Sequence, residues 1–167
     1  MTLVMEAFDE STTRKWHYEI VGHSGDGPNL QFVAYGEPPA TAKQRLDVIN
    51  KMKAHCEYSA SGDHTLEATT EAIERVYAEE ADDYIVMVIS DANLPRYGIK
   101  PQQFGAALTS NMEVQAFAVF IASIGSAAES LKKGLPLGKS WVCLDTGELP
   151  TTFGQIFAAA ATGRDWD

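Results

Sequence analysis

Residues 84–93 read YIVMVISDAN. Its first six residues are apolar and rich in β-branched side chains, which is typical of a strand that is covered on both faces. Polar residues suited to a turn follow at once. The sequence therefore predicts a buried strand over residues 84–89, with Ser90 and Asp91 at its carboxyl end.

Helices and strands alternate on both sides of this strand. Upstream, apolar residues at helical spacing predict helices over 42–58 and 66–77, and Thr41 is placed to cap the first of them. Downstream, the pattern predicts in order a helix over 101–110, a strand over 115–122, a helix over 126–133, a strand over 141–144 and a closing helix that contains residues 153–160.

The amino-terminal part predicts the end of a helix over 2–14, then strands over 16–21 and 30–35 joined by a turn at 22–27. Together these elements predict one α/β domain over 1–167, a three-layer α/β/α Rossmann-like sandwich. Its sheet is mostly parallel, with one antiparallel hairpin at an edge. Ligands of such sheets bind at the carboxyl ends of the strands, so loops 22–28, 59–65, 90–97 and 123–126 are the ones to inspect.

Composition narrows the classes of partner. The formal net charge is −10, and lysine and arginine are scattered, which argues against nucleic acid or anionic lipid as a main partner. No stretch approaches the roughly 20 apolar residues of a membrane-spanning helix, and the first residues do not resemble a secretory signal. We expect Cys56 and Cys143 to be buried, reduced thiols of an intracellular protein, with a disulfide or a reactive thiol as the alternative.

One pair of motifs suggests a metal site. Residues 61–65 (SGDHT) open a predicted helix, and Ser90 and Asp91 end the buried strand. Mg²⁺ and Mn²⁺ prefer oxygen ligands and keep several waters, so Thr65 and Asp91 are candidate ligands. Ser61, Asp63, His64 and Ser90 would shape the surrounding loops. The plainer alternative is that Thr65 caps its helix and that Asp91 belongs to an ordinary turn.

Two further motifs suggest enzymes but lack the required context. Residues 22–26 (GHSGD) resemble the G-x-S-x-G elbow of hydrolases, yet Asp26 replaces the last glycine and a strand is predicted to follow. Residues 134–140 (GLPLGKS) are one residue shorter than a phosphate-binding loop, and they lie after a helix and before a strand. A small Rossmann-like hydrolase that uses the turn at Gly22–Gly27 and His23 remains the enzymatic alternative.

The strings GDHT and VISDAN, in this order of elements, resemble the von Willebrand factor A fold and its metal-ion-dependent adhesion site. More specifically, YEIVGHSGDGP, SASGDHTLEAT and YIVMVISDANLPRYGI resemble the carboxy-terminal region of AAA+ ATPases of the MoxR and chelatase type that carry such a domain. The similarity runs from about residue 4 to residue 161. It implies a non-catalytic module that binds proteins, sometimes through a cation, and ATP hydrolysis would lie in a separate upstream module.

The chain departs from the family at its amino end. The family supplies an Asp and two Ser to the metal from a DxSxS loop after a central first strand, and no DxSxS occurs here. The resemblance implies that the chain begins within the first helix. Three explanations follow: a fragment, a first strand supplied by another polypeptide, or a gap closed by the flanking strands. We favour a supplied strand.

The resulting expectation is a protein-interaction module within a larger assembly, with a partial Mg²⁺ or Mn²⁺ site. A purely structural subunit that has lost its metal is an alternative. The resemblance favours the mitochondrial matrix, with the bacterial cytoplasm as the other compartment considered.

Overall fold

The strands of this chain form two sheets, one in each of two compact units. The computed structural model describes residues 5, 8, 16–121 and 125–162. Residues 1–64 form the first unit, which contains an antiparallel two-stranded sheet, and residues 65–167 form the second, which contains a parallel three-stranded sheet. The prediction of a single domain remains a prediction.

In the first unit, β1 (Ile20–Ser24) and β2 (Gly27–Val33) form the predicted hairpin, but in a different place along the chain. The sequence predicted the turn over 22–27, whereas the strands close around Gly25 and Asp26. The hydroxyl of Ser24 explains the tight turn, because it accepts a hydrogen bond of 3.1 Å from the Asp26 N–H. Of the predicted helix over 2–14, only residues 5 and 8 are described, and both are helical.

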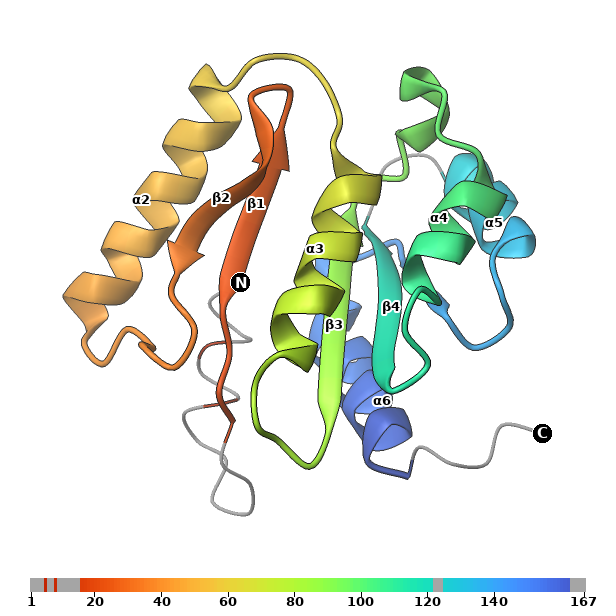
Figure 1. The fold of residues 1–167 in the computed structure, drawn as a ribbon. Coiled ribbons are helices and arrows are strands. Elements are labelled where there is room, and N and C mark those ends of the chain that lie inside the picture. Colours follow the sequence, from red (N-terminus) through yellow and green to blue (C-terminus); the bar gives the residue numbers. More distant parts are fainter. Residues whose placement is uncertain (1–4, 6–7, 9–15, 122–124, 163–167) are drawn as a thin grey trace. The chain divides into compact units, whose positions relative to one another are not determined.

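Helix α2 (Ala42–Tyr58) lies beside the hairpin (Figure 1) and has the predicted bounds. Thr41 caps it as predicted: its hydroxyl accepts the Gln44 N–H, and the Gln44 side chain in turn accepts the Thr41 N–H. The core of this unit includes Val48 of α2, which packs with Met5, Ile20 and Val33.

The sequence predicts an apolar face of α2 formed by Leu46, Ile49, Met52 and Cys56, and this prediction is correct only for Met52, which packs against the core. Leu46, Ile49 and Cys56 are exposed. Successive helical residues are about 100° apart, so the side of α2 that presents Val48 and Met52 to the hairpin turns Leu46 almost directly outward. Cys143, by contrast, is fully buried as predicted, and neither cysteine forms a disulfide.

The second unit follows the predicted alternation closely. Its main elements are α3 (Thr65–Tyr77), β3 (Tyr84–Ser90), α4 (Pro101–Leu108), β4 (Val114–Ile121), α5 (Gly125–Gly134), β5 (Ser140–Cys143) and α6 (Leu149–Thr162). Two short 3₁₀ helices, η1 (Leu94–Tyr97) and η2 (Thr146–Glu148), follow β3 and β5. All bounds lie close to the predicted ones, because Pro and polar turn residues separate clearly periodic segments.

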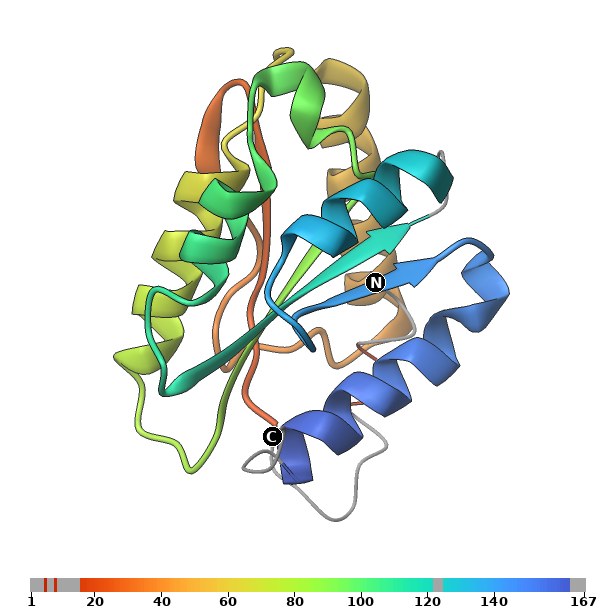
Figure 2. The same cartoon turned by 90° about the vertical axis from the view of Figure 1, so that its right-hand side faces the viewer.

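The strand order is β3-β4-β5, and both pairings are parallel. Strand β4 is paired with β3 from Tyr84↔Val114 to Ser90↔Phe120 without a shift of register. It is paired with β5 from Ala118↔Ser140 to Ile121↔Cys143. Figure 2 shows β4 and β5 side by side and pointing the same way.

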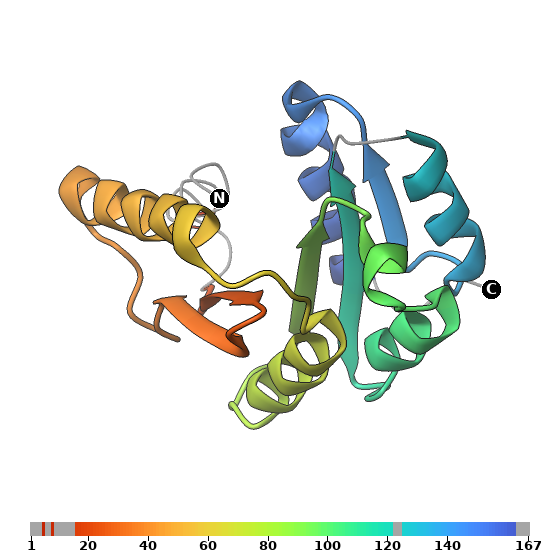
Figure 3. The same ribbon diagram turned by 90° about the horizontal axis from the view of Figure 1, so that it is seen from above.

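Helices cover both faces of this sheet. On one face, alternate residues of β4 pack against α3, α4 and α5 in a core that contains Ile73, Phe104 and Leu131. On the other face lies α6 (Figure 3), whose Ala160 carbonyl accepts a hydrogen bond of 3.0 Å from the Gln115 side chain. The three-layer α/β arrangement that the sequence predicted is therefore confirmed.

Strand β3 differs from its prediction in one respect. Its sequence is as apolar as that of β4, yet most of its residues are only half-buried, whereas β4 is almost entirely buried. The reason is topological, because β4 lies between two strands and β3 is paired with β4 alone among the described residues. In the described part of the chain, no helix is long and apolar enough to cross a membrane.

Candidate functional site

The carboxyl end of β3 and the start of α3 lie at the same edge of the parallel sheet. Helix α3 packs on β3 and is joined to it by the short connection 78–83, so the two run in opposite directions. The 13 residues of α3 span about 20 Å, and the seven of β3 about 23 Å. The structure therefore brings the Thr65 end of α3 and the Asp91 end of β3 to one edge (Figure 1).

Asp91 is exposed just beyond β3, and the loop around it is tightly bonded. Its Oδ1 accepts a hydrogen bond of 3.0 Å from the Asn93 N–H. The Ser90 hydroxyl accepts one of 3.2 Å from the Ala92 N–H. These bonds turn the chain sharply at a residue that is exposed to solvent.

The residue inside this turn is strained. Ala92 has φ of 65°, and it is the one non-glycine residue with a positive φ in the described part of the chain. The left-handed region costs an L-residue about 1 kcal/mol or more. The Ala92 side chain is nevertheless buried, and Ala92 and Leu94 belong to the same hydrophobic core. Packing of Ala92 and Leu94 therefore helps to hold the loop in the conformation that presents Asp91.

Thr65 is placed differently from Asp91. It is the first residue of α3 and only 1% exposed, and its carbonyl accepts a 2.6 Å hydrogen bond from the Thr69 hydroxyl. As ligands, the two residues would offer one hydroxyl and one carboxylate, which suit Mg²⁺ or Mn²⁺ in chemical type. Two protein ligands leave most of an octahedral shell to waters or to another molecule. The described residues contain no group of three or more His, Cys, Asp or Glu side chains able to hold a metal.

The other candidates lie in the first unit, where the 59–64 segment is bonded to the hairpin turn. Ser61 is exposed, and Asp63 and His64 are half-buried. His64 Nδ1 lies 2.6 Å from the Ser24 carbonyl oxygen, so its N–H donates there if this nitrogen is protonated. The Gly25 N–H donates to the Ala60 carbonyl at 3.0 Å. Within this unit, the role of His64 is thus to join the 59–64 segment to the hairpin.

The two enzyme-like motifs have the predicted surroundings. Ser24 is buried, its hydroxyl is engaged in the turn, and β2 follows where a nucleophile elbow would need a helix. Gly134 ends α5 and Ser140 begins β5, so no helix amino end follows the GLPLGKS loop. Neither motif has the geometry of the catalytic or nucleotide site that its letters suggest.

Two structural features were not visible in the sequence. The positive φ of Ala92 could not be predicted from the sequence, because alanine rarely adopts a positive φ. The hollows between β2 and α2 were also missed, since no motif marks them.

A comparison with known proteins identifies a relative. Over 157 residues, which are 94% of this chain, it is 47% identical to mouse von Willebrand factor A domain-containing protein 8. The chain is therefore similar to a part of that protein. The expected resemblance to a protein with a von Willebrand factor A domain is thereby confirmed, and the parallel sheet with helices on both faces agrees with that fold.

The chain spans only 8% of the length of the mouse relative, so the activity and partners of that whole protein do not transfer to it directly. No protein-family profile matches the chain. No solved structure matches it either.

Proposed function

We propose that this chain is a non-catalytic protein-interaction module that docks a partner at the carboxyl edge of the β3-β4-β5 sheet. The observation that carries the proposal is the exposed carboxylate of Asp91 on a strained, well-bonded turn at that edge. Backbone strain of this kind persists where the surrounding structure enforces it, and it is concentrated at functional loops. The name of the mouse relative supports the same class of function.

In its finer form, the proposal assigns a divalent cation to this edge. Thr65 and Asp91 would be its protein ligands, Ser90 would support the Asp91 loop, and Ser61, Asp63 and His64 would shape the preceding segment. Mg²⁺ or Mn²⁺ would supply a positive charge that an acidic side chain of the partner can bind. The acidic net charge of the chain favours cation binding in general terms.

Thermal unfolding of residues 1–167 in EDTA and in millimolar Mg²⁺ or Mn²⁺ tests the cation. A ligand at about 100 times its dissociation constant adds about 2.7 kcal/mol of stability. We expect a metal-dependent rise in Tm that Asp91→Ala removes. Asp145→Ala is a matched control, because Asp145 is also exposed after a strand, and its Oδ1 accepts the Gly147 N–H at 2.8 Å. If Tm does not depend on metal, or if both variants lose the metal-dependent rise equally, the cation is ruled out. The chain would then be a metal-free binding module or a structural subunit.

The second part of the proposal concerns the edge of β3 away from β4, where no strand of the described residues pairs with it. Exposed edge strands in natural proteins are usually protected by charges, prolines or bulges, and residues 84–90 contain none of these in the register with β4. Its apolar side chains suit a strand with neighbours on both sides. We propose that a strand of another polypeptide, or of a longer chain, pairs with β3.

Co-expression tests this pairing. The probe is the roughly 30 residues that precede the matched segment in the mouse relative, a length that accommodates a strand with its flanking connections. We expect the two polypeptides to co-purify and the hydrogen exchange of β3 amides to slow, while β5 amides are unchanged. The strand partner is ruled out if residues 1–167 alone are stable and monomeric, their β3 amides are already protected and they do not bind the probe. That result would not affect the test of the cation.

A further inference from the structure

A continuous groove runs between β2 and α2 within the first unit. One hollow of about 480 Å³ and another of about 510 Å³ share the side chains of Gln31, Phe32 and Lys51. The α2 residues that line them recur at helical spacing and so form a single helical face: Gln44, Asp47, Val48, Lys51, Ala54, His55 and Tyr58. From the first to the last of these, α2 rises about 21 Å.

The other wall of the groove is the free edge of β2. Side chains of a strand alternate between its two faces, yet four consecutive residues, 31–34, line the first hollow. A hollow can touch consecutive residues when it lies along the strand's edge. Strand β2 is paired with β1 alone among the described residues, and Gly27–Val33 contains no charged side chain to block that edge. Its Pro28 lies at the start of the strand and lines neither hollow.

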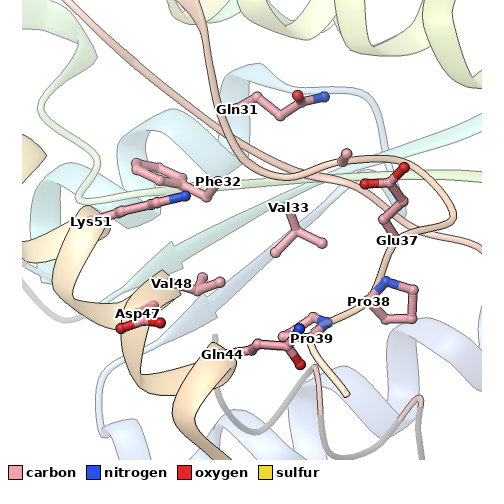
Figure 4. A pocket seen from close by; sticks show the side chains of 11 residues that line it. Gln31, Phe32, Val33, Glu37, Pro38, Pro39, Gln44, Asp47, Val48 and Lys51 are labelled. Atoms are coloured by element: carbon pink, nitrogen blue, oxygen red, sulfur yellow. The ribbon is translucent and has the colours of Figure 1, made fainter. Parts of the chain in front are cut away.

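The floor of the groove is apolar, and α2 places Asp47 and Lys51 along one wall. Two further acidic residues, Glu37 and Asp26, line the first and the second hollow. Figure 4 shows Val33 and Val48 facing one another across the first hollow, with the Lys51 side chain beside Phe32. Lys51 forms none of the ion pairs found among the described residues. Asp47 lies one helical turn before it.

We propose that this groove binds an extended peptide segment of a partner protein, which adds to the free edge of β2 and carries a basic and an acidic residue two positions apart. The spacing follows from the two repeats. Asp47 and Lys51 are about 6 Å apart along the axis of α2, and residues i and i+2 of an extended chain are about 6.6 Å apart on the same side. The basic side chain therefore faces Asp47 while the acidic one faces Lys51.

The length of the groove agrees with the same occupant. An extended segment of about six residues spans about 20 Å, close to the 21 Å of the lining face of α2. Backbone hydrogen bonds to β2 would supply much of the affinity, and the two charges would fix the register, as in other cases of strand addition. This surface lies wholly within residues 1–64 and does not depend on the site at Asp91.

Titration of ¹⁵N-labelled 1–167 with a synthetic peptide tests the proposal. The probe is acetyl-TVRVEVT-amide, whose Arg and Glu stand two positions apart. We expect saturable shifts of the amide signals of residues 31–34 and of the lining face of α2. A peptide with Gln in place of both charges should bind roughly 5- to 20-fold more weakly. N-methylation of alternate residues on the edge that pairs with β2 should abolish binding.

Charge-reversal variants identify the contact. Lys51→Glu should weaken binding of the probe roughly 5- to 20-fold. Lys53→Glu is the matched control, because Lys53 lies on the same helix, is exposed and does not line the groove. Its Nζ lies 3.8 Å from Glu57 Oε1. Equal effects of the two variants, or no shifts at millimolar peptide, would overturn the proposal. Concentration-dependent shifts of residues 31–34 without peptide would also overturn it and identify a second copy of the chain as the occupant.

Discussion

The amide N–H of Ala60 donates a hydrogen bond of 2.8 Å to Oδ2 of Asp26, 34 residues earlier in the chain. The same carboxylate oxygen lies 3.4 Å from the Ser24 hydroxyl, which donates to it. One exposed carboxylate thus joins the hairpin turn to the segment that follows α2. This contact explains why the 59–64 segment, which has no regular secondary structure, has a defined place in the first unit.

Asp26→Ala should destabilise the first unit, because it leaves the Ala60 N–H and the Ser24 hydroxyl without this acceptor. The expected loss is about 1–2 kcal/mol in the free energy of unfolding, measured by urea denaturation. Asp82→Ala is the control, since Asp82 is also an exposed aspartate. Similar midpoints for both variants would show that the Asp26 contact contributes nothing measurable.

Two glycine substitutions should have opposite signs. A Cβ at Gly25 would lie 2.4 Å from the backbone oxygen of Ser61, so Gly25→Ala should cost about 1–3 kcal/mol by forcing the two segments apart. A Cβ at Gly154, within α6, meets nothing within 4 Å. Gly154→Ala should therefore stabilise the protein by about 0.5–1 kcal/mol through helix propensity. Thermal unfolding of both variants beside the parent chain checks the signs, and a neutral Gly25→Ala would contradict the close approach.

Ala92→Val tests the strained turn. A β-branched side chain is a poor fit to a φ of 65°, and Ala92 is only 2% exposed, so the added methyl groups also meet a packed core. We expect a loss of about 2 kcal/mol or more in stability. Chemical shifts of Asp91 and Asn93 should change most, because the turn must reorganise. A variant as stable as the parent would show that the backbone at this position readily adopts another conformation.

Lys139 should make stability depend on pH in the alkaline range. Its Nζ lies 5.2 Å from the centre of the Phe117 ring, and partial burial lowers its pKa below the ordinary value of 10.5. Between the lowered pKa and 10.5, the unfolded chain binds more protons than the folded one, so this group makes stability rise with pH in that window. At neutral pH the penalty is fully present. Lys139→Met should therefore raise Tm at pH 7, and the gain should shrink as the pH approaches 10.

Lys132→Met is the control for that measurement, since Lys132 is exposed in the last turn of α5. Its effect on Tm is measured at the same pH values as that of Lys139→Met. If the difference between Lys139→Met and the parent stays constant from pH 7 to pH 10, burial of Lys139 does not affect its proton binding.

How far the sequence alone predicts this fold depends on whether each signal is local. Both ends of helix α2 were predicted to the residue, because Thr41 caps its start and a polar segment follows Tyr58 at its end. Its buried face was mispredicted because the choice between Val48 and Leu46 depends on where the hairpin packs. The apolar run of β3 predicted a strand correctly, but its half-burial depends on which strands pair with it.

The same limit applies to the candidate site. The sequence placed Asp91 after a strand and Thr65 at a helix start, and parallel topology then brought those two element ends to one edge. The opposite exposures of the two residues could not be foreseen, because neighbouring side chains from distant segments decide them. The groove between β2 and α2 has the same origin, since it exists only once the helix lies beside the hairpin.

The unequal pairing of β4 has a consequence for how the second unit opens. Strand β3 accompanies β4 along its whole length, whereas β5 begins only at Ala118. The N–H groups of a strand point alternately to its two sides, and the Ala118 N–H donates to the Lys139 carbonyl on the β5 side at 2.8 Å. The amides of residues 118 and 120 are therefore exposed to deuterium when β5 detaches, whereas those of 115, 117, 119 and 121 are exposed when β3 detaches. Consecutive amides of this one strand thus report on the opening of two different strand pairs.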